Sequence, residues 1–178
     1  TYVVDSTSDT VTENSSEGTD LIQSSITFTA SNNVENLTLI GSGNIDGTGN
    51  TLANTLTGNS GNNTLDGGSG DDTLDGGAGD DTLTGGSEND ELSGGAGNDT
   101  FNVDSGIDTI SDLTTGDILK VSVGATVNAN NIYDFVATNQ TENLGAANLY
   151  ASNGNATVDL TDSLSGSYFI FGGAGTDT

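Results

Sequence analysis

The chain has 178 residues, and its 26 acidic residues face a single basic one, Lys120, which gives a formal net charge of −25. This balance excludes nucleic acid as a partner, because phosphate binding needs clusters of Lys and Arg, and it disfavours an anionic membrane surface for the same reason. The absence of Cys and His excludes disulfides, thiolate metal sites and imidazole bases, and no apolar run is long enough to insert into a membrane as a helix.

Residues 1–57 are predicted to form short β-strands. Tyr2-Val3-Val4, Ile26-Thr27-Phe28 and Leu37-Thr38-Leu39 show strand propensity or period-two alternation, and Gly and Asn residues separate them. We interpret this flank as a degenerate β-solenoid that continues into the next region. A separate small β-domain is the alternative.

Residues 58–117 repeat every nine residues. The central units read GGSGDDTLD, GGAGDDTLT, GGSENDELS and GGAGNDTFN. Apolar residues hold position eight of successive units, at Leu56, Leu65, Leu74, Leu83, Leu92, Phe101, Ile110 and Leu119. Aspartates hold position six, at Asp72, Asp81, Asp90, Asp99, Asp108 and Asp117. An unbroken lattice of this kind indicates a repeat architecture rather than disorder.

The repeat predicts an all-β fold, a parallel β-roll or β-solenoid with β-rich flanking segments. A strand such as Thr73-Leu74-Asp75 points one apolar side chain inward, and the glycines of the preceding turn permit the positive φ values that a chain reversal needs. Two nonapeptides then make one coil, and the coils stack in parallel. Each turn presents backbone carbonyls and one carboxylate, which are the hard oxygen ligands that calcium prefers.

Calcium is also expected on energetic grounds. One apolar residue in nine gives a thin core, and carboxylates that repel one another oppose compaction. The chain has almost no positive charge of its own, so we expect bound cations to neutralise the repeats and to couple ligation to folding.

The units resemble the G-G-x-G-x-D-x-U-x nonapeptide of the RTX (repeats-in-toxin) family, the haemolysin-type calcium-binding β-roll of bacteria. The strong match covers Gly67 to Asn102, and degraded units, GNSGNNTLD and VDSGIDTIS, flank it. The resemblance implies that each Ca²⁺ lies between turns two units apart, held by the carbonyls of positions one to four and by the position-six Asp. It also implies that Asp72, Asp90 and Asp108 stack on one edge, and Asp81, Asp99 and Asp117 on the other.

The metal-binding residues implied by this resemblance occupy the turns of the repeats. They are Gly67, Gly68, Ser69, Gly70, Asp72, Gly76, Gly77, Ala78, Gly79, Asp81, Gly85, Gly86, Ser87, Asp90, Gly94, Gly95, Ala96, Gly97, Asp99, Gly106, Asp108, Asp117, Gly173 and Asp177.

Several units depart from the family pattern. Glu88 replaces the fourth glycine of its unit, which predicts strain in that turn, and Asn63 is a weaker, neutral ligand in place of Asp. Val103-Asp104 and Asp112-Leu113 replace glycine pairs, so the last turns are expected to bind calcium loosely or not at all.

Residues 118–171 are predicted to be a β-rich segment that caps or connects the solenoid, although Asn128 to Ala137 is ambiguous between strand and helix. Residues 172–178 read GGAGTDT and begin a further RTX turn. The residues Thr1-Tyr2-Val3-Val4 would complete that repeat if they followed it. This predicts a fragment of a longer chain, with neighbouring copies or modules joined end to end.

Catalytic interpretations are weaker than the structural one. Paired carboxylates serve glycosidases, but such pairs do not need to recur every nine residues. Asp104-Ser105-Gly106 matches an aspartic-protease signature that occurs here only once, and Lys120 near Ser122 is more simply a solvated cation than a Ser-Lys dyad. Threonine triplets such as Thr55-Leu56-Thr57 and Thr82-Leu83-Thr84 suggest ice binding, but most units interrupt the ladder.

We therefore expect a non-catalytic, calcium-binding structural module of a secreted, extracellular or surface-displayed bacterial protein, such as a surface layer, adhesin or fibre. The resemblance implies export through a type I secretion channel in an unfolded state, with folding outside the cell. The alternative is a secretion or binding module attached to a secreted enzyme or toxin.

Overall fold

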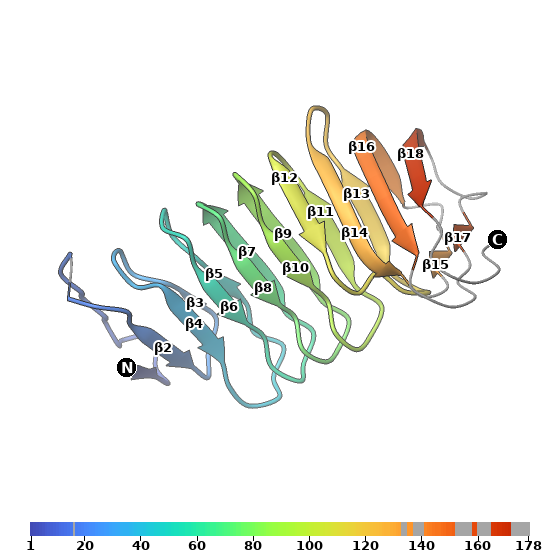
Figure 1. The fold of residues 1–178 in the computed structure, drawn as a ribbon. Coiled ribbons are helices and arrows are strands. Elements are labelled where there is room, and N and C mark those ends of the chain that lie inside the picture. Colours follow the sequence, from blue (N-terminus) through green and yellow to red (C-terminus); the bar gives the residue numbers. More distant parts are fainter. Residues whose placement is uncertain (16, 133–134, 137–140, 152–157, 160–164, 172–178) are drawn as a thin grey trace.

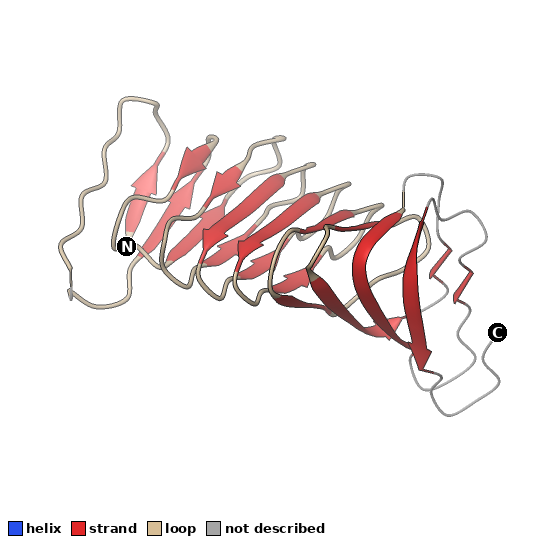
Figure 2. Cartoon of the chain, turned by 90° about the horizontal axis from the view of Figure 1, so that it is seen from above, coloured by secondary structure: helices blue, strands red, loops and turns tan. Residues whose placement is uncertain are grey.

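The computed structural model describes the chain except for residues 16, 133–134, 137–140, 152–157, 160–164 and 172–178. The regular secondary structure of the described part consists only of strands, β1 to β18, which are connected by turns and loops. Every strand pair is parallel. One continuous 16-stranded sheet winds into a solenoid whose coils lie side by side along a long axis (Figures 1 and 2). No helix in this part of the chain is long and apolar enough to cross a membrane. The predicted all-β parallel solenoid is confirmed.

The sheet has two faces joined at one end. The first face runs through β1 (Tyr2–Val4), β2 (Leu21–Ser24), β4 (Asn36–Leu39), β6 (Thr55–Thr57), β8 (Thr73–Asp75), β10 (Glu91–Ser93), β12 (Ile107–Ile110) and β14 (Thr126–Ile132). The second face runs through β3 (Phe28–Thr29), β5 (Gly47–Thr48), β7 (Thr64–Ser69), β9 (Thr82–Ser87), β11 (Thr100–Val103) and β13 (Ile118–Val121).

The repeat region has a constant register of 18 residues. On the first face Leu56 pairs with Leu74 and Leu74 with Leu92, and on the second face Leu65 pairs with Leu83. Two nonapeptides therefore form each coil, as the nine-residue lattice predicted. A constant register places equivalent residues of successive coils directly above one another, about 4.8 Å apart.

The core is a file of side chains enclosed by the two faces. The three-residue strands of the repeats, β6, β8 and β10, bury their central residue and turn the flanking residues outward. The position-eight residues are at most 1 % exposed, and they are Leu56, Leu65, Leu74, Leu83, Leu92, Phe101, Ile110 and Leu119.

The N-terminal flank continues the same sheet and the same core. β2 pairs with β4 through Ile22 and Leu37, and β4 pairs with β6 through Leu37 and Leu56. Val4, Ile22 and Leu37 belong to one buried cluster with the leucines of the repeats. The flank is thus packed directly against the first repeat coil.

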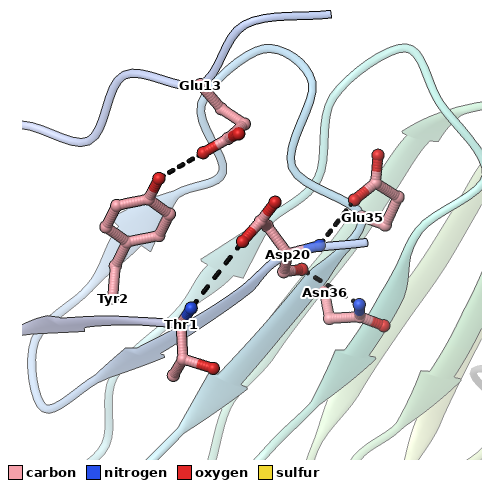
Figure 3. A network of polar contacts seen from close by, with 6 residues as sticks. All are labelled: Thr1, Tyr2, Glu13, Asp20, Glu35 and Asn36. Carbon is pink, nitrogen blue, oxygen red and sulfur yellow. Dashed lines mark hydrogen bonds and ion pairs between the residues drawn. The ribbon is translucent and has the colours of Figure 1, made fainter. Parts of the chain in front are cut away.

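Polar contacts hold the first strands together (Figure 3). The Tyr2 hydroxyl donates a hydrogen bond to Glu13, and this bond raises the pKa of Tyr2 to about 12. The backbone nitrogen of Asp20 donates to Glu35 at 2.9 Å, and Asn36 Nδ2 donates to the Asp20 carbonyl at 3.0 Å. The first bond ties β1 to the loop that follows it, and the other two join the residues at the starts of β2 and β4.

The C-terminal segment continues the sheet beyond the repeats. β16 (Glu142–Ala151) pairs with β13 through its first residues and with β14 through the rest, so it joins the two faces. β18 (Ser165–Phe171) pairs with β16, and β15 (Phe135–Val136) and β17 (Val158–Asp159) form a separate two-stranded sheet. The ambiguous segment from Asn128 to Ala137 is strand at both described parts, with Ile132 and Phe135 fully buried.

Candidate metal centre

Position-six residues form two columns, one along each edge of the solenoid. The Asp72 column contains Asn54, Asp72, Asp90 and Asp108, and the Asp81 column contains Asn63, Asp81, Asp99 and Asp117. All of these side chains are 0–3 % exposed. The six aspartates therefore stack in the two sets that the resemblance implied, with one carboxylate per coil in each column.

Each carboxylate uses one oxygen to bind the coil before it. Oδ1 accepts a hydrogen bond from the backbone nitrogen of the position-six residue 18 positions earlier. The donor–acceptor distances are 2.6 Å for Asn54 and Asp72, 2.8 Å for Asp72 and Asp90, and 3.1 Å for Asp90 and Asp108. In the other column they are 2.7 Å for Asn63 and Asp81, 2.8 Å for Asp81 and Asp99, and 2.9 Å for Asp99 and Asp117.

The second oxygen of four carboxylates has no donor. Oδ2 is buried and makes no hydrogen bond in Asp72, Asp81, Asp90 and Asp108. An ionised carboxylate oxygen that is buried without a partner costs several kcal/mol, in the range of about 2–7 for a polar group and more for a charge. A cation beside Oδ2 would remove this cost.

Burial also disturbs the ionisation of both columns. Desolvation raises the pKa of Asp72 and Asp108 to about 7 and that of Asp99 to about 6, in each case against the opposing effect of the backbone hydrogen bond to Oδ1. The same cause raises the pKa of the other three aspartates in the columns. Perturbed groups of this kind mark functional sites when they cluster with a geometric reason.

Glycine at position one lets the backbone pass close to three of the orphaned oxygens, those of Asp72, Asp81 and Asp90. A Cβ atom at Gly67 would lie 2.4 Å from Asp72 Oδ2 and 2.5 Å from the carbonyl oxygen of Gly85, in the next coil. A Cβ at Gly76 would meet Asp81 Oδ2 at 2.5 Å and the Gly94 carbonyl oxygen at 2.7 Å. Each of these two turns therefore brings a carboxylate oxygen of one coil close to a carbonyl oxygen of the next, and an all-oxygen donor set of this kind fits calcium.

Carboxylates alone do not make these sites. No group of three or more His, Cys, Asp or Glu side chains gathers around a common point among the described residues. Each column contributes only one carboxylate per turn. The resemblance implies that main-chain carbonyls supply the remaining donors, which stays a prediction.

Turn residues of successive coils also bind one another. Ala96 donates its backbone nitrogen to the Gly77 carbonyl at 2.9 Å, and Gly79 donates to the Ala96 carbonyl at 2.8 Å. On the opposite edge, β7 and β9 extend their pairing through Ser69 and Ser87. The turns are thus held at a fixed spacing.

Glu88 adopts a left-handed backbone conformation with φ of 78°, which confirms the strain predicted for its turn. Its side chain offsets part of this strain. Glu88 Oε2 accepts hydrogen bonds from the Gly70 backbone nitrogen at 2.9 Å and from Ser87 Oγ at 2.7 Å, and the bond from Gly70 lowers the pKa of Glu88. The substitution therefore connects its turn to the previous coil.

Asp117 differs from the other aspartates because both of its oxygens have donors. Oδ1 accepts from Asp99, and Oδ2 accepts from the Thr114 backbone nitrogen at 2.7 Å and from Thr114 Oγ1 at 3.1 Å. A carboxylate satisfied in this way has less need of a cation than Asp81 or Asp90, each of which has a buried oxygen without a donor.

The residues that stand in place of the glycine pairs have other roles. Val103 and Leu113 are fully buried in the apolar core. The Asp112 carboxylate accepts hydrogen bonds from the backbone nitrogens of Gly94 at 3.1 Å and Gly95 at 2.8 Å. The last coil therefore relies on apolar packing and side-chain caps where the earlier coils have glycine pairs.

Asn54 belongs to the Asp72 column, although it lies before residue 58, where the predicted repeats begin. The sequence does carry a signal that the repeats begin earlier. Gly49, Asn54 and Leu56 lie nine residues before their counterparts in the next unit. Leu52 and Ala53 obscured it, because they occupy the turn in place of the Gly and Asn that follow one repeat later.

The structure does not support the Ser-Lys dyad or the threonine ladder. Ser122 Oγ donates to Asp104 at 3.3 Å rather than to Lys120, which is exposed. Thr55 and Thr57 lie on β6 of the first face, whereas Thr82 and Thr84 lie on β9 of the second, so they form no common threonine ladder. Gly173 and Asp177, with the end-to-end joining inferred from them, lie outside the described residues.

Comparison with known proteins agrees with this geometry. A model of the RTX calcium-binding nonapeptide repeat (4 copies) matches residues 48–83 and, in a second overlapping match, residues 75–110. No curated protein and no solved structure matches the chain significantly.

Proposed function

Residues 48–110 belong to the RTX calcium-binding nonapeptide repeat family, and from this premise we propose that the chain is a non-catalytic structural module that folds and stiffens on binding calcium. We place the module in a secreted or surface-displayed bacterial protein, such as a surface layer, an adhesin or an extracellular fibre.

The observation that carries the proposal is the row of buried, unpartnered Oδ2 atoms in Asp72, Asp81, Asp90 and Asp108. Those of Asp72, Asp81 and Asp90 lie beside the first glycine of their own turns, and those of Asp72 and Asp81 also lie close to a carbonyl of the next coil. Such an arrangement is unfavourable for a protein that has only itself to satisfy these oxygens. It becomes favourable once a cation binds between the coils.

We assign the ligands by unit. In each complete unit the position-six carboxylate and the carbonyls of positions one to four would hold the ion, as in Gly67-Gly68-Ser69-Gly70 with Asp72. Calcium suits such a set because it takes six to eight oxygen ligands in flexible geometry. Magnesium suits it less, because it requires strict octahedral geometry and retains its waters.

Charge gives calcium a second role. The chain carries a formal net charge of −25, and Lys120 is its only basic side chain. Each bound Ca²⁺ would cancel repulsion between carboxylates of stacked coils while linking those coils. Binding energy then becomes folding energy, as in other small cores that depend on a metal.

The expected affinity fits a protein that folds outside the cell. Extracellular calcium modules bind with Kd values of about 10⁻⁴–10⁻³ M. With such affinities the repeat coils would stay open at cytosolic calcium levels and close after export.

Circular dichroism with calcium and EGTA tests the proposal. We expect the β-signal of the repeats to be largely lost in EGTA, restored by millimolar calcium, and restored poorly by the same concentration of magnesium. The exposed-site variant Asp5→Asn should behave as the wild type does. A spectrum unchanged by EGTA would refute calcium-dependent folding.

A further inference from the structure

Asn54 and Asn63 hold position six in the first repeat coil, directly beneath the aspartates. Both side chains are 3 % exposed. The backbone nitrogen of Asn54 donates to Asp72, and that of Asn63 donates to Asp81. The two asparagines thus begin the two columns in which the aspartates continue.

The side chains of Asn54 and Asn63 donate hydrogen bonds to the previous coil, whereas those of the aspartates accept them. Asn63 Nδ2 donates to the Ile45 carbonyl of the previous coil at 2.6 Å, whereas Asp81 Oδ1 accepts from the previous coil. Asn54 Nδ2 likewise donates to the carbonyls of Val34 at 3.0 Å and Glu35 at 3.2 Å.

The amide oxygens are satisfied within their own turns. Asn63 Oδ1 accepts from the Asn59 backbone nitrogen at 2.8 Å, and Asn54 Oδ1 accepts from the Asn50 backbone nitrogen at 2.7 Å. Only this orientation of the amide pairs each donor with a carbonyl and each acceptor with an N–H. Asn54 and Asn63 therefore leave no orphaned oxygen, in contrast to Asp72 and Asp81.

The amide nitrogen of Asn63 takes the place that Oδ1 has in the aspartates and reverses its hydrogen bond, since it donates to a carbonyl of the previous coil where Oδ1 accepts from an N–H. An aspartate at residue 63 would have no N–H to donate to the Ile45 carbonyl. The amide thus links the first repeat coil to the flank through neutral groups.

We propose that Asn54 and Asn63 form an amide lock that ends the calcium array at its N-terminal side and holds the coil of residues 49–66 on the flank without calcium. The calcium-dependent coils then begin at residue 67 and stack on a coil that is already folded. This inference rests on the proposed function, since it states where the calcium array begins.

Hydrogen–deuterium exchange in EGTA, read by mass spectrometry, tests the lock. In the wild-type chain we expect residues 36–66 to stay protected in EGTA while residues 67–117 exchange rapidly. Asn63→Ala should speed exchange of residues 45–66 in EGTA by about tenfold or more, the loss expected for a buried hydrogen bond with an unsatisfied partner. The control Asn32→Ala, at an exposed asparagine, should leave exchange unchanged.

The number of calcium ions bound, measured by equilibrium dialysis with elemental analysis, tells whether Asn63 acts as a lock or as a calcium ligand. Asn63→Ala should bind as many calcium ions as the wild type. Loss of one ion with unchanged exchange in EGTA would show that Asn63 is a ligand and overturn the lock.

Asn63→Asp keeps the size of the side chain and removes the amide donor. We expect it to lose protection of residues 45–66 in EGTA, and protection at the wild-type level would overturn the proposal. If the wild type bound no calcium at all, the proposed function would fail, whereas protection of residues 36–66 in EGTA would still be measurable.

Discussion

The carboxylate of Asp99 accepts a hydrogen bond from the backbone nitrogen of Asp81 at 2.8 Å, one coil away, whereas the second oxygen of Asp81 itself has no donor. The aspartates therefore have two separate tasks. One oxygen aligns the coils without metal, and the other is left for a cation. The predictions below separate these two tasks.

Asp81→Ala and Asp117→Ala should respond differently to calcium. Each removes the acceptor of a buried backbone N–H, which costs about 1–3 kcal/mol. Asp81→Ala also removes an oxygen that we assign to calcium, so it should raise the calcium concentration needed for folding. Asp117→Ala mainly loses the bonds from Thr114, and its cost should be similar with and without calcium. Calcium titrations followed by circular dichroism would measure both, and a larger calcium shift for Asp117→Ala would refute the assignment.

Gly85→Ala should disrupt one calcium turn. The added Cβ would lie 2.2 Å from Asp90 Oδ2 and 2.7 Å from Asp90 Cβ, so the aspartate would have to move. Overpacking of this kind costs about 1–3 kcal/mol, and we expect at least one calcium ion to be lost. Gly43→Ala is the matched control, because its Cβ would meet only Ile45 Cγ2 at 4.0 Å. Urea unfolding in millimolar calcium would compare the two variants. Equal urea midpoints would contradict the steric clash expected in Gly85→Ala.

The backbone strain at Glu88 predicts an order of stability. Glu88→Ala keeps the left-handed φ of 78° and loses the bond from Gly70, whereas Glu88→Gly loses the bond but relieves the strain. We expect Glu88→Gly to be more stable than Glu88→Ala by about 1 kcal/mol. Urea unfolding of both variants in calcium would decide, and the reverse order would show that the left-handed conformation is not strained.

Acid should partly replace calcium in stabilising the folded repeats. Burial raises the pKa of Asp72 and Asp108 from an ordinary 3.8 to about 7, so the calcium-free folded state binds more protons than the unfolded state between these values. The stability that protonation provides is complete below pH 3.8 and is lost as pH rises through about 7. In EGTA, the β-signal should therefore be stronger near pH 5 than at pH 8.

The same linkage predicts that calcium binding weakens on acidification through pH 7, because protons and calcium compete for the carboxylates. Calorimetric titrations at pH 6 and pH 8 would measure this, with proton uptake checked in two buffers. The double variant Asp72→Asn and Asp108→Asn should show a smaller pH dependence. A calcium affinity that is independent of pH would show that these carboxylates are not ligands.

Much of the fold could be predicted because equivalent residues recur at a constant interval. The nine-residue spacing of Leu65, Leu74 and Leu83 fixes the inward side of each strand, and an 18-residue coil then places Asp72 over Asp90. The departures could not be predicted from the spacing. Whether Glu88 caps Gly70, or whether Asp112 caps Gly94, depends on side-chain conformations across two coils.

The central claim is that cations bind beside the unpartnered carboxylate oxygens between the coils. Crystals grown in calcium, with anomalous scattering recorded at a long wavelength where calcium contributes, test it most directly. The account predicts anomalous peaks within coordination distance, about 2.3–2.6 Å, of Oδ2 of Asp72, Asp81, Asp90 and Asp108, and none beside Asn54 or Asn63. Peaks confined to the exposed carboxylates of Asp71 and Asp80, or no ordered peaks at all, would contradict it.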